Sequence, residues 1–274
     1  GIDNSRAGVV SFTATEVSVR NSEFRRNGLG IELLGGSATV EGVTARNSDG
    51  AGLDTALDLS RLTVDDSVFT DNGGQGLLVR EVADGTARIR NVTANGNGVD
   101  GIAIRSSAPG ATLAEITASG NDRHGVLLGS RDTTVVGAMA NDNTESGLVL
   151  PALAGATDGR ELRPGDGEIG LEASGNGQAG ARLSGSDTTV VGLQADDNRD
   201  GIDLTDATGV TVTDATPGDG DRGVGARSNT RYGVVLSNTT DSAVNETLVQ
   251  GNGVTGIHAV SSERNLLADL TVND

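Results

Sequence analysis

The stretch Asn121-Asp122-Arg123-His124-Gly125-Val126-Leu127-Leu128 decides the fold, because close copies of it recur along the chain. Each copy has an Asn, a short bend that ends in Gly, and then two apolar residues two positions apart. The copies lie about 22–25 residues apart, a period typical of repeat architectures. Ser48 takes the Asn position once, and the other copies have Asn27, Asn72, Asn97, Asn121, Asn143, Asn176, Asn198, Asn229 and Asn252.

Each repeat carries a second apolar pattern upstream of its Asn. Three residues before the Asn stands a small or aromatic residue, as at Phe69, Ala94 and Ala118. The apolar spacing is two or three residues, which indicates short strands and no helix. Eight residues before the Asn position come Val19, Val40, Val64, Ile89, Leu113, Val135, Val190 and Val244.

One repeat cannot bury an apolar face alone, but stacked repeats can, because each column of similar residues packs on itself. A coil of parallel strands achieves this. In this pattern the sequence resembles the right-handed parallel β-helix family, of the pectin-lyase-like and NosD-like kind. The resemblance implies an all-β, single-stranded right-handed parallel β-helix, a solenoid of about ten turns with two longer turns.

The Asn column has a structural explanation. An inward Asn at a bend supplies both a donor and an acceptor for buried backbone groups, and stacked Asn side chains can bond to one another along the coil. We therefore predict that these residues form a structural Asn ladder. Ligand binding by the same side chains is the alternative.

We expect residues 1–274 to form a single β-helix domain. The repeat pattern stops partway through a repeat and shows no polar cap, which favours a fragment of a longer chain. Two repeats are longer than the rest, and we place their insertions at about 151–166 and 206–221. Insertions in solenoids map to loops, often on the working face.

Composition limits the function. The formal net charge is -18, and all 20 basic residues are Arg. This composition resembles that of proteins from extreme halophiles and predicts a salt-adapted surface. General nucleic-acid binding is excluded because phosphate contacts need basic patches. There is no Cys, hence no disulfide framework, and no apolar run approaches a membrane span.

Few residues suggest a metal or cofactor site. Asp219 and Asp221 offer carboxylate oxygens that suit calcium, and a solvated Gly–Asp turn is the alternative reading. His124 and His258 stand several repeats apart and share no site in the sequence pattern. We expect no other cofactor.

The outward position of the Gly-containing strand is apolar over four successive repeats, at Leu78, Ala103, Leu127 and Val149. Such an apolar stripe usually marks a contact surface. We expect the insertion after Val149 to fold back over it, and a second subunit is the alternative cover.

The resemblance leaves the activity open, because one fold serves many functions. Enzymes of this family group Asp with Arg, Lys or His, and Lys is absent here. We therefore expect an exported, salt-adapted scaffold at the cell surface or outside the cell, which binds glycan or another surface polymer through its flank and insertions. The alternative is a polysaccharide lyase, glycoside hydrolase or epimerase.

Overall fold

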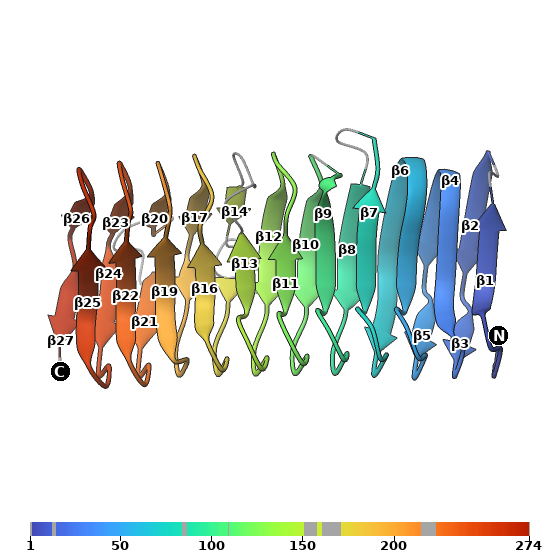
Figure 1. The fold of residues 1–274 in the computed structure, drawn as a ribbon, viewed down its shortest axis with the longest axis horizontal. Helices are drawn as coiled ribbons and strands as arrows, with labels where there is room; N and C mark the ends of the chain where they lie inside the picture. The colour runs from blue at the N-terminus through green and yellow to red at the C-terminus, as the bar shows by residue number, and fades with distance from the viewer. Residues whose placement is uncertain are drawn as a thin grey trace.

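The computed structural model describes residues 2–12, 15–83, 87–108, 110–150, 158–160, 171–214 and 223–273, with the side chains of 56–58, 106–107 and 158–160 excepted. These residues form strands and no helix. Each strand pairs in parallel with its equivalent one turn later, so the chain winds into an all-β right-handed parallel β-helix of about ten turns. Figure 1 shows the turns in sequence order along the long axis, with the two ends of the chain at opposite ends. The predicted fold class is confirmed.

The turns build three faces, each a parallel sheet. The strand after the Gly forms the first, which we call the glycine sheet. It contains β1 (Ala7–Phe12), the starts of β4 (Leu29–Glu41) and β6 (Leu53–Thr70), β7 (Leu77–Glu81), β9 (Ile102–Ser107), β11 (Val126–Leu128), β13 (Leu148–Leu150), β16 (Ala179–Leu183), β19 (Asp200–Thr205), β22 (Tyr232–Ser237) and β25 (Thr255–Val260).

The second sheet follows in each turn, and long strands continue into it or through it. It contains β2 (Glu16–Arg20), the end of β4, the middle of β6, the starts of β8 (Ala87–Thr93), β10 (Thr112–Thr117) and β12 (Thr134–Met139), then β14 (Asp158–Arg160), β17 (Thr189–Val191), β20 (Thr211–Thr213), β23 (Ala243–Asn245) and β26 (Leu266–Ala268). The third sheet completes the turn. It contains β3 (Glu23–Arg25), β5 (Thr44–Arg46), the ends of β6, β8, β10 and β12, then β15 (Leu171–Glu172), β18 (Leu193–Gln194), β21 (Val224–Arg227), β24 (Thr247–Gln250) and β27 (Thr271–Asn273).

The core is the inside of the coil. It is filled by stacked columns of Val, Ile, Leu and Ala, with Phe69 as its largest fully buried side chain. The glycines that open the glycine-sheet strands face this interior. A Cβ at Gly125 would lie 2.7 Å from Cβ of Ala140 and 2.8 Å from Nδ2 of Asn143. A larger residue has no room there, which explains why Gly recurs at this position.

The Asn residues of the repeat lie one above the next inside the bend that precedes the glycine sheet. Oδ1 of Asn121 accepts the backbone N–H and the Nδ2 of Asn97, at 2.9 and 3.1 Å. The remaining Nδ2 hydrogen of Asn97 goes to the carbonyl of Phe69 at 3.0 Å. The same bond from a backbone N–H to the Oδ1 of the next Asn joins Asn72, Asn97, Asn121, Asn143, Asn176, Asn198, Asn229 and Asn252.

A second ladder lies two residues before the first, on the outside of the coil, and the sequence analysis missed it. The side chain of Asn95 accepts the backbone N–H of Ser119 at 2.8 Å. Ser119 in turn accepts from Asn141 at 3.1 Å, and Asn141 from Ser174 at 2.8 Å. The sequence did contain a signal for this ladder, because Asn, Ser or Asp stands two positions before the ladder Asn in several successive repeats.

The sharp bends use left-handed backbone. The residue just before the Asn ladder has a positive φ in successive turns, as at Asp71 (φ 56°), Gly96 (φ 64°) and Asp142 (φ 56°). Gly, Asn and Asp tolerate this region better than other residues. The bends of the coil therefore account for part of the high content of Gly and Asp. The Asp residues also add to the negative surface charge.

The predicted insertions need correction. Asp158–Arg160 lies inside the first predicted insertion but forms β14, which pairs with β12 and β17. In the second, Thr211–Thr213 forms β20, which pairs with β17 and β23. Both segments therefore belong to the regular coil, and the insertion boundaries at 151–166 and 206–221 are too wide. Repeat length alone could not show this, because strand pairing decides which residues stay in the coil.

Candidate functional site

The outer edge of the glycine sheet, where its strands begin, carries most of the buried charge. Asp200, at the start of β19, pairs in register with Tyr232 at the start of β22. The outward residue three positions later forms a second column, in which Arg182, Asp203 and Val235 are neighbours. The two columns together bring side chains from β16, β19, β22 and β25 onto one surface.

Asp200 is the centre of this surface. Its side chain is only 2% exposed, and a buried carboxylate needs compensating charge. Arg231 supplies it through two hydrogen bonds, Nε to Oδ1 at 2.8 Å and Nη2 to Oδ2 at 2.6 Å. Nε of Arg199 lies 3.4 Å from the same Oδ2. The hydrogen bond to Asp200 raises the pKa of Arg231.

A second ion pair adjoins the first. Nε of Arg182 donates to Oδ2 of Asp203 at 3.1 Å, and the Asp203 side chain is 10% exposed. Three guanidinium groups therefore face two carboxylates, an excess of one positive charge. This excess lies on a chain whose formal net charge is -18.

Tyr232, the only tyrosine of the chain, extends the surface. Its ring is parallel to the imidazole of His258, with a centroid distance of 4.5 Å and an interplanar angle of 5°. Cζ of Arg231 lies 4.6 Å from the centroid of the Tyr232 ring, a cation–π distance. We name Arg182, Arg199, Asp200, Asp203, Arg231, Tyr232 and His258 the arginine–tyrosine cluster.

A second polar group lies along the same edge towards the N-terminus. The backbone N–H of Ser146 donates to Nδ1 of His124 at 3.3 Å, and Nε2 lies 3.3 Å from Oε2 of Glu145. Asp100, with a side chain 2% exposed, accepts the backbone N–H of His124 at 3.4 Å and lies 3.7 Å from Nη1 of Arg123. We name Asp100, Arg123, His124 and Glu145 the histidine cluster.

The two clusters influence one another. Burial lowers the pKa of His124, the carboxylates of Asp100 and Glu145 oppose this, and the charges of Arg123 and Arg182 lower it further. Because Nδ1 accepts a hydrogen bond from Ser146, the proton of the neutral imidazole resides on Nε2, towards Glu145. Arg182 belongs to the arginine–tyrosine cluster, so charge is coupled along this edge.

The apolar stripe lies on the glycine sheet beside the histidine cluster, and its last residue, Val149, is the register neighbour of Arg182. Its residues are neighbours in register, from Leu78 through Ala103 and Leu127 to Val149. Leu78, Ala103 and Val149 are 2%, 3% and 6% exposed, and Leu127 is half-buried. The insertion expected to cover them lies largely outside the described residues, and so do Asp219 and Asp221. Among the described residues, no group of three or more His, Asp or Glu side chains is arranged to hold a metal ion.

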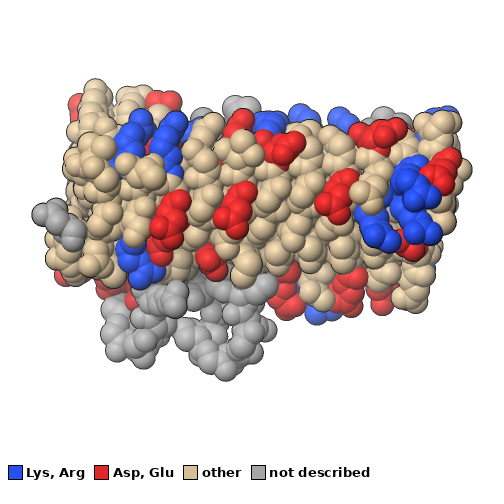
Figure 2. Space-filling model, turned by 90° about the horizontal axis from the view of Figure 1, so that it is seen from below, with Lys and Arg blue, Asp and Glu red and all other residues tan. Residues whose placement is uncertain are grey.

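Charge is unevenly spread over the surface that carries the Asn bends. Figure 2 shows Arg side chains gathered towards the two ends of this face, with separate acidic side chains between them. Sequence reasoning missed the arginine–tyrosine cluster because its members come from four different turns. The available signal was that Tyr232 and His258 both stand at outward-facing positions of adjacent glycine-sheet strands.

The sequence profile described as "Right handed beta helix region" matches residues 2–115. No curated protein matches the sequence significantly. In the described part of the chain, no helix is long and apolar enough to span a membrane.

Solved structures share the fold at low sequence identity. The A-module of the Azotobacter vinelandii mannuronan C-5 epimerase AlgE6 has 18% identity and a TM-score of 0.68, over 99% of this chain and 79% of that one. The periplasmic alginate epimerase AlgG has 13% identity and a TM-score of 0.62, over 93% and 74%. Pectate lyase Pel9A has 16% identity and a TM-score of 0.51, over 95% and 70%. The chain is therefore a right-handed parallel β-helix protein: it shares this fold with these solved structures, and its match to the right-handed β-helix region covers residues 2–115.

Proposed function

We propose that this chain is an exported, salt-adapted β-helix that binds an anionic polysaccharide along the outer edge of its glycine sheet. The arginine–tyrosine cluster would make the principal contact. Its partner would be a uronic-acid polymer outside the cell or at the cell surface. The proposal replaces the broader expectation of contact through the flank and the insertions with one defined surface.

The observation that carries this proposal is the excess positive charge of the arginine–tyrosine cluster. Arg199 and Arg231 share the buried Asp200, so one carboxylate is faced by two guanidinium groups. Their side chains remain 44% and 42% exposed, which leaves N–H groups available to a ligand. Arginine suits planar carboxylates because its N–H donors form a fixed fork.

The surroundings of these arginines support the same ligand class. Asp200 and Asp203 hold the guanidinium groups in fixed positions, so little side-chain freedom would be lost on binding. The stacked rings of Tyr232 and His258 add a partly exposed flat surface with polar edges. Two solved structures with this fold are an alginate epimerase and a pectate lyase, and alginate and pectate are polymers of uronic acids.

The test is affinity electrophoresis and calorimetry with alginate and polygalacturonate, with neutral dextran as comparison. We expect both uronic-acid polymers (uronans) to bind and dextran not to bind. Arg231→Gln and Arg182→Gln should each weaken uronan binding about tenfold, the scale of one charged hydrogen bond. The matched control is Arg264→Gln, because Arg264 makes the same two-bond pair with Asp241 at 2.6 and 2.7 Å on an exposed surface elsewhere.

Catalysis on the same polymer is the second candidate function, and the Tyr232–His258 stack favours it. Epimerisation or elimination on a uronate begins with removal of the proton next to the carboxylate. Arg231 could neutralise that carboxylate, while Tyr232 and His258 are groups that can move a proton. Proton NMR of alginate would reveal epimerisation, and ultraviolet absorbance of unsaturated chain ends would reveal elimination.

The two functions predict different variants. If the chain is a catalyst, Tyr232→Phe should abolish turnover and leave binding nearly unchanged. If it only binds, neither product forms in the parent protein. Uronan binding equally strong in Arg231→Gln, Arg182→Gln and Arg264→Gln would contradict the proposed site for both functions.

A further inference from the structure

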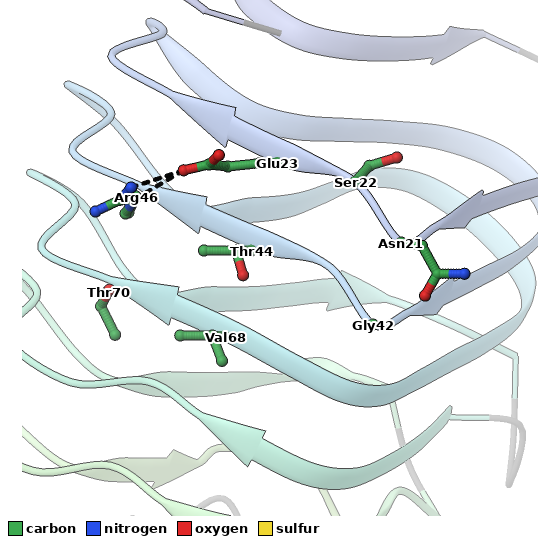
Figure 3. A pocket seen from close by; sticks show the side chains of 8 residues that line it. All are labelled: Asn21, Ser22, Glu23, Gly42, Thr44, Arg46, Val68 and Thr70. Carbon is green, nitrogen blue, oxygen red and sulfur yellow. Dashed lines mark hydrogen bonds and ion pairs between the residues drawn. The ribbon is translucent and has the colours of Figure 1, made fainter.

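A groove lies on the third sheet near the N-terminal end of the coil, on a different sheet from the arginine–tyrosine cluster. It is shallow and open to solvent, with a volume of about 600 Å³. Figure 3 shows its side chains on the neighbouring strands β3, β5 and β6 and on the bends before them. It is lined by Asn21, Ser22, Glu23, Gly42, Thr44, Arg46, Val68 and Thr70.

The shape of the groove follows from the sizes of the residues in one outward column. Glu23, Thr44 and Val68 are neighbours in register across β3, β5 and β6. Small β-branched side chains therefore form the floor beside the longer Glu23. At the bend, Gly42 has a φ of 62°, and a Cβ there would lie 2.7 Å from Oδ1 of Asn21. Gly42 thus keeps the space under the Asn21 amide open.

One wall is a neutral ion pair. Nε and Nη2 of Arg46 both donate to Oε1 of Glu23, at 3.1 and 2.7 Å, and both side chains are 44% exposed. The hydrogen bond from Arg46 lowers the pKa of Glu23, so the carboxylate stays charged. The lining residues therefore carry no net charge, and an anionic ligand would face Glu23.

The rest of the lining offers hydrogen-bonding groups. The hydroxyls of Thr44 and Thr70 make no hydrogen bond to any residue that the structure describes. The side-chain amide of exposed Asn21 is likewise without such a bond in the described ranges. Val68, the register neighbour of Thr44, contributes methyl groups to the floor. Hydroxyls, an amide, a neutral ion pair and a small apolar floor suit a ligand that has many hydroxyls and no charge.

We propose that this third-sheet groove is a second binding site, for a neutral saccharide chain. It is separate from the uronan site and does not depend on the proposed function. The groove contains no aromatic ring, so recognition would depend on hydrogen bonds, each of modest net strength. We expect weak affinity for single sugars and stronger binding with increasing chain length.

The test uses cellohexaose, mannohexaose and xylohexaose as probes, with hexagalacturonate as the acidic comparison. Binding is followed by NMR amide shifts of the full chain. At least one neutral hexasaccharide should shift amides of β3, β5 and the end of β6. Thr44→Val and Thr70→Val preserve side-chain shape and remove a hydroxyl. The double variant should bind about tenfold more weakly, as expected for two lost hydrogen bonds.

The matched control is Thr117→Val, which lies in the same outward column two turns beyond Val68 and should bind as the parent does. Arg231→Gln should also leave neutral binding unchanged, which separates this site from the uronan site. The proposal is overturned if no neutral probe shifts the groove amides. It is also overturned if only hexagalacturonate does so, or if Thr117→Val weakens binding as much as the double variant.

Discussion

The side-chain amide of Asn121 donates to Oδ1 of Asn143, 3.0 Å away and one turn further along the coil. The same oxygen accepts the backbone N–H of Asn121 at 2.9 Å. One Asn side chain therefore satisfies two donors of the preceding turn while its own amide reaches forward. Because both residues are buried, this contact links adjacent turns where water cannot replace it.

Asn121→Ala should therefore destabilise the protein. It removes the acceptor of two donors of Asn97 and leaves buried groups unpaired, at a cost of about 1–3 kcal/mol. Asn121→Ser retains a hydroxyl and should cost less. Urea unfolding measures both, and uronan binding per folded molecule should not change. Unchanged stability together with lost binding would show that the ladder serves a ligand.

Ser48 is the weak position of the ladder. Its backbone N–H donates to Oδ1 of Asn72 at 3.1 Å, but its own buried Oγ has no partner among the described residues. Ser48→Asn should restore the repeat and raise the free energy of unfolding by about 0.5–1.5 kcal/mol. Chemical denaturation checks this, and a loss of stability would mean that the bend at Ser48 is too narrow for Asn.

The apolar stripe should contribute to stability. Leu78 is 2% exposed although it points away from the coil interior. Leu78→Ala should cost about 2–4 kcal/mol, and Leu127→Asp about 1–3 kcal/mol. Glu32→Ala, in the same column and partly exposed, should stay within about 0.5 kcal/mol. Melting and solution mass are measured together, since a folded Leu127→Asp monomer from an oligomeric parent would show that a second subunit covers the stripe.

His124 should make stability depend on pH near neutrality. Its folded pKa is lowered, chiefly by burial, so the unfolded chain takes up a proton at a higher pH than the folded chain. The free energy of unfolding should therefore fall as pH drops below about 6.5, the ordinary pKa of His. His124→Gln should reduce this slope below about pH 6.5 and leave it unchanged at higher pH. An identical slope in the variant would contradict the assignment.

Salt should stabilise the protein. With a formal net charge of -18 and no Lys, the surface repels itself at low ionic strength, and added salt screens this repulsion. The Tm should rise between about 0.1 M and molar NaCl. A Tm that stays flat or falls as NaCl is added would contradict the hypothesis of a salt-adapted surface.

The repeat period, the apolar columns and the Gly and Asn positions determined the coil from sequence alone, because a side chain that stacks on its own equivalent must recur at each turn. Phe69, Gly125 and Asn121 could be placed inside in this way. The column of Leu78, Ala103, Leu127 and Val149 was also readable, since it needs only the strand period.

The contacts that set the candidate sites were decided by the tertiary structure. Asp200 contacts Arg231, which lies thirty-one residues later in the sequence. Most turns of the coil are shorter than this. The contact forms because strand pairing restores the register of the coil after the extra residues of this turn. Tyr232 stacks on His258 because adjacent strands bring together positions that differ by three within the repeat. Turn length and strand register set these distances, and both result from the stacked coil rather than from any single repeat.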